Sequence, residues 1–458
     1  MNPVLLIAIP LLFAFISIAS KKLAMPFLLL VTAFNVGAVF FMDKGMYSIG
    51  GFNELGINLL LDQLAFVGLV LVNSLFFLVI LTNCKDSRKL STVLLITLAG
   101  VNGLLLTNDL FNLFVFLEIT GISAYLITTQ NKKPLASFNY LVQGTVGSGL
   151  YLLGLILLYT MIGTLNMAEV FSRINEYSIP ASNLVLPFML MFIGLGVEAK
   201  LLPFNSWVKG VLDNANALTS AMIATVIASA IALTFGRLLN IVFVLDNIMV
   251  IITVILAVTI IAGEAAAFVS KNVREILLFS AIATSGLTII LFANGLVVPA
   301  IMLVIANALS KFILFTITGK IIEQTNTDYV DELQGVFANN KLMGTVYSVA
   351  ALSVTGLPLF FGFVVKLNLL QGLFSLDMFL IPALILVASL IEGTYFIRLL
   401  VKLWYGEHSK VKFNLVVKAV TVVFAAIIVI LGVYSEPVTD LVEDIPAEIV
   451  EYLEGGNF

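Results

Sequence analysis

The chain has 458 residues, of which 60% are hydrophobic and only 11% are charged. About a quarter of the residues of a soluble globular protein are charged, so the composition excludes that class and indicates a lipid environment. The single cysteine and single histidine, Cys84 and His408, exclude an internal disulfide and leave no ligand set for an iron–sulfur cluster, a haem or a zinc site. We therefore expect no cofactor and no metal in this chain.

Long apolar runs follow one another along the whole chain. A helix needs about 20 apolar residues to cross the hydrocarbon core of a bilayer. Fourteen runs approach or exceed this length, at 3–19, 25–42, 60–81, 92–107, 110–130, 137–160, 183–208, 216–236, 245–269, 275–294, 297–319, 341–370, 378–400 and 412–433. The first run has no positive charge before it, so we interpret it as a membrane helix and not as a cleaved signal. The sequence predicts an all-α membrane protein with about 14 transmembrane helices.

Lysine and arginine are divided unevenly between the connecting loops. Loops after odd-numbered runs hold sixteen of the 23 basic residues, including Lys132, Lys133 and Lys410. Loops after even-numbered runs hold three, namely Lys44, Arg173 and Arg237, and the other four lie within runs. Because cytoplasmic loops carry the excess of basic residues, this division places both termini outside, together with the acidic segment 436–454.

Two runs contain residues that break a helix. Run seven reads GVEAKLLPFNSW, with Pro203 after Lys200, and run twelve reads SVTGLPLFFGFVVKLNLL, with Gly356 and Pro358 before Lys366. In lipid, such breaks persist only where protein or a water-filled cavity satisfies the freed backbone groups. The two runs cross in opposite directions, five helices apart, which is typical of inverted repeats with a site at each break. We predict three N-terminal helices (1–91), a first five-helix repeat (92–240), a second, inverted five-helix repeat (241–405), and a final helix with an acidic external tail (406–458).

Four charged side chains lie deep inside the runs, at Glu118, Lys200, Lys311 and Lys366. A charge at the bilayer centre costs about 2.5–3.5 kcal/mol even on lenient scales. Burial favours the neutral form of both residue types, so each can take and release a proton. The alternative is a set of structural ion pairs. Three lysines and one clear acid, however, cannot all form ion pairs with one another.

Three other acids are weaker candidates. Glu392 either joins a pathway or pairs with Arg398, and Glu264, near a helix end, is expected to be solvated. Glu198 is two residues from Lys200 and projects to a different helix face, where packing, a lipid headgroup or function would each explain it.

The remaining polar features favour structural roles. Asp62 and Asp109 precede runs three and five, where an N-terminal acid suits the helix dipole. The glycines between 144 and 154 lie inside run six at the spacing of close-packed helices. No Walker A motif is present, so ATP-driven transport has no support.

With these residues in view, the chain resembles the antiporter-like subunit family. This family comprises the proton-pumping membrane-arm subunits of respiratory complex I, the large subunits of Mrp sodium/proton antiporters, and equivalents in membrane-bound hydrogenases and sulfane reductases. The resemblance covers roughly residues 60–405. It rests on NDLFNLFVFLEITGISAYL (108–126), YLVQGTVGSGLYLLGLILLY with GTLN (140–166), GLGVEAKLLPFNSW (194–207), KNVREILLFSAIATSG (271–286), NALSKFILFTITG (307–319) and GLPLFFGFVVK (356–366).

The resemblance assigns roles to the four buried charges. It implies that Glu118 and Lys200 form the glutamate–lysine pair of a first half-channel. Lys366 matches the lysine of the broken helix in the second half-channel, and Lys311 matches a lysine that connects the two.

The chain also departs from the family pattern at three positions. Asn205 and Asn307 stand where the family usually has histidine, and Ser229 stands where the eighth helix usually has lysine. Ser229 could still carry water together with Thr225 and Ser220. The departures leave three alternatives open: this subunit uses one half-channel, favours sodium, or has a partly structural role.

The leading hypothesis is an ion-translocating subunit, for H⁺ and/or Na⁺, of a redox-driven complex of the complex I, hydrogenase or sulfane reductase type, or of an Mrp-type antiporter. Its partners would be further antiporter-like subunits, small hydrophobic subunits and, in a redox-driven complex, peripheral iron–sulfur subunits; no nucleic acid is expected. It would then be a cofactor-free membrane subunit of an oxidoreductase. The alternatives are a membrane scaffold that conducts nothing, favoured by Ser229, and a stand-alone transporter of a small solute, which would want neutral hydrogen-bonding groups. The resemblance indicates the plasma membrane of a prokaryote.

Overall fold

The computed structural model describes residues 1–50, 56–129, 134–213, 215–242, 246–406 and 411–453. Within these residues the regular structure is helical, apart from one short β-hairpin. Lys132, Lys133, His408 and Lys410, which were considered from the sequence, lie outside the described residues.

The first half of the chain forms the elements α1 (Leu5–Ala19), α2 (Ala24–Ala38), β1 (Gly45–Ile49), β2 (Ile57–Leu61), α3 (Gln63–Thr82), α4 (Cys84–Lys89), α5 (Ser91–Leu106), α6 (Leu110–Thr128), α7 (Pro134–Ile162), α8 (Met167–Glu176), α9 (Ala181–Glu198), α10 (Ser206–Leu212), α11 (Ala217–Ala221), a π-helical segment (Met222–Ile227) and α12 (Ala228–Ile241). The second half forms α13 (Asp246–Val269), α14 (Val273–Ala293), α15 (Val297–Thr325), α16 (Lys341–Thr355), α17 (Phe361–Ser375), α18 (Leu380–Trp404), α19 (Leu415–Val433), α20 (Glu436–Val442) and α21 (Ile445–Leu453). Short 3₁₀ turns occupy Val39–Phe41 and Val330–Leu333.

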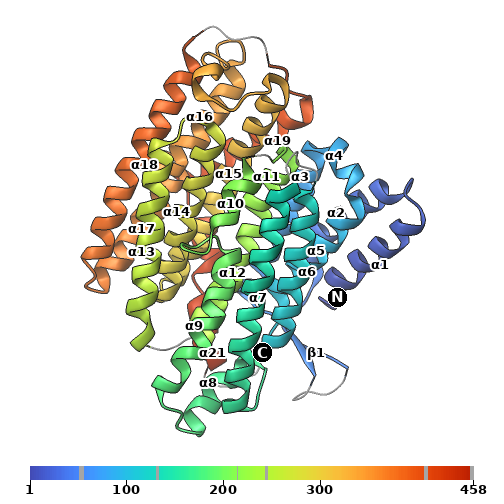
Figure 1. Ribbon diagram of the computed structural model, residues 1–458, viewed down its shortest axis with the longest axis vertical. Coiled ribbons are helices and arrows are strands. Elements are labelled where there is room, and N and C mark those ends of the chain that lie inside the picture. Colours follow the sequence, from blue (N-terminus) through green and yellow to red (C-terminus); the bar gives the residue numbers. More distant parts are fainter. Residues whose placement is uncertain (51–55, 130–133, 214, 243–245, 407–410, 454–458) are drawn as a thin grey trace.

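The long helices form one elongated bundle (Figure 1). Helices α1 and α2 lie on one side, α13 and α18 lie on the opposite side, and α12, α14 and α15 lie between them. The spans Ala217–Ile241, Val273–Ala293 and Val297–Thr325 are 83–89% buried within the chain. Most polar side chains in the middle of these central helices are therefore surrounded by protein.

Eleven helices in the described residues are long and apolar enough to cross a membrane, and three shorter apolar helices, α1, α5 and α17, accompany them. Each of the fourteen predicted runs overlaps at least one helix. The all-helical membrane fold is confirmed, whereas the number of fourteen crossings and the division into two repeats stay predictions.

Both predicted breaks are present. Run seven divides into α9 and α10, with Pro203 between them, and run twelve divides into α16 and α17. Gly356 ends α16 with a φ of 78°, a backbone conformation that a residue without Cβ adopts at little cost. The acids predicted to favour the helix dipole also cap their helices: Asp62 accepts a hydrogen bond from the amide of Ala65 at the start of α3, and Asp109 accepts one from the amide of Asn112 at the start of α6.

One residue that we predicted in an outer loop lies instead inside the bundle. Arg237 belongs to α12, where its side chain is 3% exposed and forms an ion pair of 2.5 Å with Asp62. The loop prediction is wrong because the helix continues to Ile241, five residues beyond the apolar run, and the distant Asp62 supplies the counter-charge.

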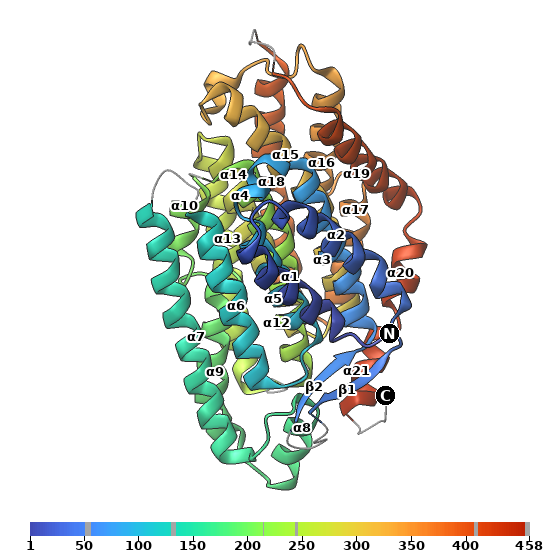
Figure 2. The same ribbon diagram turned by 90° about the vertical axis from the view of Figure 1, so that its right-hand side faces the viewer.

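Several smaller elements at one end of the bundle were not predicted. The antiparallel hairpin pairs Gly45 with Leu61, and α8 and α21 lie nearby (Figure 2). The acidic tail is folded onto the chain, because Glu448 forms an ion pair of 2.9 Å with Lys44 and the hydroxyl of Tyr452 donates to Asn108.

Candidate functional site

Lys200 lies at the break between α9 and α10. Its φ of 64° is in the left-handed region, which costs a residue with a side chain of the order of 1–3 kcal/mol. The break is closed locally by two hydrogen bonds, from the amide of Leu201 to the carbonyl of Gly196 (2.8 Å) and from the indole of Trp207 to the carbonyl of Val197 (3.1 Å). Strain of this kind is concentrated at functional sites, where the surrounding structure holds it.

The amine of Lys200 points at the π-helical segment that joins α11 to α12. It donates to the carbonyl of Ile223 across 3.5 Å, and only 3% of the residue is exposed. Short π-helical segments frequently mark functional sites. The next residue, Ala224, lines a cavity that continues along α12.

That cavity contains Lys311, the lysine at the centre of α15. Lys311 is 6% exposed and donates a hydrogen bond to the hydroxyl of Thr284 on α14. Ser229, which stands in place of the lysine usual in the family, lies in the wall of the same cavity. The cavity offers about 40 Å³ to the centres of water molecules. One water needs about 10–15 Å³ by that measure, so water can bridge Ser229 and Lys311.

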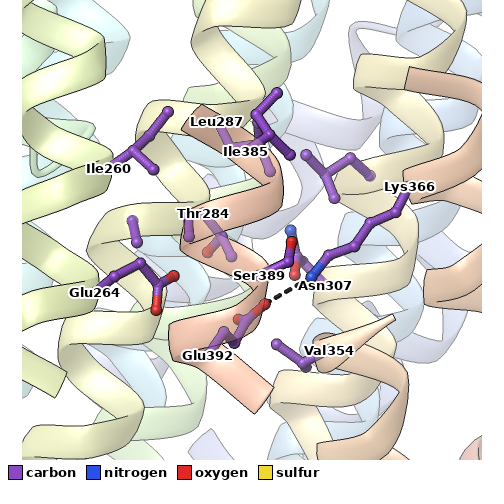
Figure 3. A pocket seen from close by; sticks show the side chains of 13 residues that line it. Ile260, Glu264, Thr284, Leu287, Asn307, Val354, Lys366, Ile385, Ser389 and Glu392 are labelled. Carbon is purple, nitrogen blue, oxygen red and sulfur yellow. Dashed lines mark hydrogen bonds and ion pairs between the residues drawn. The ribbon is translucent and has the colours of Figure 1, made fainter. Parts of the chain in front are cut away.

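A second cavity holds the ion pair of Lys366 and Glu392 (Figure 3). The amine of Lys366 on α17 lies 2.7 Å from Oε2 of Glu392 on α18 and 3.1 Å from the carbonyl oxygen of Thr355. Both side chains are buried, at 13% and 4% exposed. The sequence left two roles open for Glu392. Glu392 does not pair with Arg398, because Arg398 donates instead to the backbone carbonyl of Phe268.

The two cavities share two polar side chains. Thr284 on α14 and Asn307 on α15 line both of them. Asn307, which the sequence marked as a departure from histidine, is therefore placed between the Lys311 cavity and the Lys366–Glu392 cavity. Thr284 was missed from the sequence; the signal was a group of three hydroxyl residues, Ser280, Thr284 and Ser285, within the largely buried stretch SAIATSG (280–286).

Glu264 corrects one prediction. We expected it to be solvated near the end of a helix, but it is 4% exposed and lines the second cavity opposite Lys366 (Figure 3). The prediction is wrong because α13 continues to Val269 and α18 packs alongside it. No hydrogen-bond partner for Oε2 of Glu264 occurs in the described part of the chain.

The first half of the site contains two acids. Among the described residues Glu118 on α6 makes no hydrogen bond or ion pair, so its pairing with Lys200 stays a prediction. Glu198, at the end of α9, accepts hydrogen bonds from the hydroxyls of Tyr125 (3.3 Å) and Tyr140 (3.1 Å). Glu198 is therefore fixed by two donors between α6, α7 and α9.

Three other candidates lie beside this path. Asn205 begins α10, is half-buried and lines neither cavity. Thr225 and Ser220 donate their hydroxyls back to the carbonyls of Ala221 and Asn216 in their own helix. The described residues contain no group of three or more His, Cys, Asp or Glu side chains that could hold a metal ion.

At the end of α10, outside the membrane spans, Asp213 lies among charged groups. Partial burial, followed by the charge of Glu275, raises the pKa of Asp213 to about 6. Glu275 is paired with Lys209 at 2.8 Å, and Arg274 donates to the backbone carbonyl of Asp213. This carboxyl can gain or lose a proton near neutral pH.

Comparisons with known proteins identify the family. The profile of the family described as "NADH:quinone oxidoreductase/Mrp antiporter, TM" matches residues 107–392. The D subunit of the Na(+)/H(+) antiporter of Bacillus subtilis (strain 168) is 27% identical over 400 residues, which cover 83% of this chain and 80% of the relative. The N subunit of the NADH-quinone oxidoreductase of Desulforudis audaxviator (strain MP104C) is 28% identical over 429 residues, or 87% and 85% of the two chains.

A solved structure is similar over almost the whole length. It is a chain of "the membrane-bound sulfane sulfur reductase (MBS), an archaeal respiratory membrane complex", with a TM-score of 0.92 and 27% identity. The match covers 99% of this chain and 98% of that chain.

Proposed function

This chain belongs to the NADH:quinone oxidoreductase/Mrp antiporter family of membrane subunits, and we propose that it carries a small cation, H⁺ or Na⁺, across the membrane as one subunit of a larger complex. One observation supports this most: the cavity of Lys311 and the cavity of Lys366 and Glu392 share Thr284 and Asn307. A row of ionisable groups linked by water-sized spaces is what proton passage through a bilayer requires.

The lysines can act as proton carriers. A lysine ammonium that gives its proton to a neighbouring water becomes neutral, and the low-dielectric interior favours that neutral form. Glu392 lies 2.7 Å from the amine of Lys366, within reach for direct transfer of a proton between the two groups. We propose Lys200, Lys311 and Lys366 as the residues that carry the proton, with Glu118 serving Lys200.

Ser229 is the strongest argument for the alternative function, a membrane scaffold that conducts no ions. Replacement of a lysine by Ser229 removes one proton carrier, and this favours the scaffold. Ser229 nevertheless lines the cavity of Lys311, where water can bridge the gap, so we prefer translocation.

The partners and the orientation belong to the same proposal. The relatives are named as subunits of antiporter and oxidoreductase assemblies, so we expect further membrane subunits around this chain, with iron–sulfur subunits if the complex is redox-driven. With Arg237 inside the bundle, the loops of the outer side keep two basic residues, Lys44 and Arg173, against sixteen on the inner side. Both termini would then be outside the plasma membrane of a prokaryote.

The decisive experiment is ion flux through the assembled complex in liposomes. Lys311→Ala should reduce flux at least tenfold, while Lys341→Ala, at an exposed lysine, should leave it unchanged. Flux through the Lys311→Ala complex at the wild-type rate would retire the proposal. Purification in mild detergent should retain the other membrane subunits, and a lone protein with full transport would favour the solute carrier.

A further inference from the structure

Two acids and one base face the second cavity, but only one acid is paired. Lys366 forms its ion pair with Glu392, whereas Oε2 of Glu264 is buried and has no hydrogen-bond partner among the described residues. Figure 3 shows Glu264 on the wall opposite Lys366, with its carboxyl group directed toward the cavity and Glu392. An ionised carboxylate in this position would be an uncompensated buried charge beside a second carboxylate, which is strongly unfavourable.

Among the described residues, Lys366 is the one lysine that lines the cavity of Glu264. Lys311 on α15 acts on Glu264 and Glu392 from a distance, but it lines the other cavity and donates its hydrogen bond to Thr284. The helices packed around Glu264, α13, α14 and α18, contribute the hydroxyls of Ser280, which contacts Oε1 of Glu392 at 3.5 Å, and of Tyr395, which is buried. Within this cavity the positive charge of Lys366 therefore faces two carboxyl groups, and local charge balance favours one of them protonated.

We propose that Glu264 is a further proton-carrying residue, which holds a proton while Lys366 pairs with Glu392. When that ion pair opens, the O–H of Glu264 donates its proton to a water in the cavity, and the same water donates a proton to the carboxylate of Glu392. Glu264 is left as a carboxylate and Glu392 as a neutral acid, so no charge is created and Lys366 can pair with Glu264 instead. The cavity offers about 20 Å³ to water centres, enough for one water of about 10–15 Å³.

This inference rests on the proposed function, so its test needs a readout that does not depend on transport. Infrared difference spectroscopy on the purified complex detects the C=O stretch of a protonated carboxyl. We expect Glu264→Gln to remove one such band and to lower flux in liposomes at least tenfold. Glu443→Gln, at an exposed carboxyl of the C-terminal segment, should change neither.

The outcomes separate the two proposals. If Glu264→Gln keeps every carboxyl band and wild-type flux while Lys311→Ala loses flux, the role of Glu264 is overturned and translocation stands. If the wild-type complex conducts nothing but Glu264→Gln still loses the band, Glu264 is protonated as inferred and the proposed function fails.

A separate observation concerns the outer surface of α1 to α4. A groove of about 1020 Å³ is walled by apolar residues of α2 and α3 and closed at one end by three basic side chains: Met25, Pro26, Leu29, Leu30, Ala33, Phe77 and Leu81, with Lys21, Lys22 and Arg88. Among the described residues, none of the three basic side chains makes an ion pair. A groove with a cationic end and apolar walls is complementary to a lipid with a negatively charged headgroup.

We propose that this groove binds an anionic phospholipid, with its phosphate at Lys21, Lys22 and Arg88 and an acyl chain along α2. The basic residues belong to the side that the charge rule places in the cytoplasm, where basic pockets between membrane helices bind anionic headgroups. The groove is at the upper end of the roughly 300–1,000 Å³ of small-molecule sites, which leaves room for an acyl chain.

Photo-crosslinking tests this assignment on the assembled complex in nanodiscs. Phosphatidylglycerol with a diazirine in its acyl chain should label the peptides around 21–33 and 77–88 more strongly than the matching phosphatidylcholine. The triple variant Lys21→Gln, Lys22→Gln, Arg88→Gln should weaken phosphatidylglycerol binding by roughly fivefold per lost charge. The control triple Lys271→Gln, Lys341→Gln, Lys412→Gln, at exposed lysines away from the groove, should not.

Two results would overturn the lipid assignment. One is equal labelling by the two lipids. The other is a photoreactive amino acid at Leu30 that crosslinks to a neighbouring subunit and not to lipid, which would make the groove a protein interface.

Discussion

Lys366 and Glu392 form an ion pair of 2.7 Å between α17 and α18, directly after a broken helix and within the membrane part of the chain. If the pair only stabilised the fold, removing both charges would cost little. Removal of one partner of a buried pair typically costs about 3–5 kcal/mol, whereas replacement of both is often neutral.

We therefore expect Glu392→Gln to lower both the thermal midpoint and the ion flux. The double variant Lys366→Met, Glu392→Gln should recover the thermal midpoint and still lack flux, because Lys366, one of the three proposed proton-carrying lysines, is lost. Thermal unfolding and liposome flux of the two complexes measure this. Recovery of flux in the double variant would mean that the pair is structural.

Ser229 allows the water path to be tested separately from charge. Ser229→Leu fills the cavity beside Lys311 and should reduce flux at least tenfold, because the space for water is lost. Ser229→Ala keeps the space and should retain most of the flux. If Ser229→Leu conducts like the wild type, ions do not pass between Ser229 and Lys311.

The first half of the path has two acids that can be told apart. We expect Glu118→Gln and Lys200→Ala each to abolish flux while the complex still assembles. Glu198→Gln should keep hydrogen bonds to Tyr125 and Tyr140 and affect flux less. The opposite order, measured as flux per assembled complex, would transfer the role of proton partner of Lys200 to Glu198.

The pKa of Asp213 predicts a pH dependence of stability. Burial raises this pKa from 3.8 to about 6, so the folded state binds more protons than the unfolded state between about pH 4 and pH 6. Stability from this group must then fall as the pH rises through that window. The group is half-exposed, so we expect an effect of about 1 kcal/mol and not the full value of the shift.

Between pH 4 and pH 6, the thermal midpoint of Asp213→Asn should depend less on pH than that of the wild type. The matched control is Asp440→Asn, at an exposed aspartate of the C-terminal segment. An unchanged slope in Asp213→Asn would assign the pH dependence to other groups.

Asp62 connects α3 with α12 through its ion pair with Arg237. Asp62→Asn leaves a buried guanidinium without its counter-charge, and we expect a loss of about 3–5 kcal/mol in stability. Asn can still cap α3, so the loss reports the ion pair and not the cap. A thermal midpoint equal to that of Asp109→Asn, where only a capping acid is changed, would contradict this.

The apolar runs predicted the helices because hydrophobic length is visible locally in a sequence. The breaks at Pro203 and Gly356 were equally visible, since both residue types interrupt helices for reasons of their own covalent structure. Lys311 and Lys366 could be identified because a single charge stands out within an apolar run.

Other features depend on residues far apart in the chain and could not be predicted. Arg237 was placed in a loop because its partner Asp62 is 175 residues away. Glu264 looked like a helix-end residue, and only the packing of α13 against α18 shows that it is buried. The sharing of Thr284 and Asn307 between two cavities is a property of how α14 and α15 meet, and no local pattern encodes it.

The π-helical segment Met222–Ile227 sets which side of α12 meets the cavity. A π-helical turn accommodates one residue more than an α-helical turn, so all residues that follow are rotated by about 100° relative to a regular helix. In this rotated register, Ser229 lines the same cavity as Lys311. The helix register set by the π-helical segment therefore helps to decide which residue of α12 lines the cavity of Lys311. A deletion of one residue within this segment would rotate α12 and place a different row of its residues in the cavity wall.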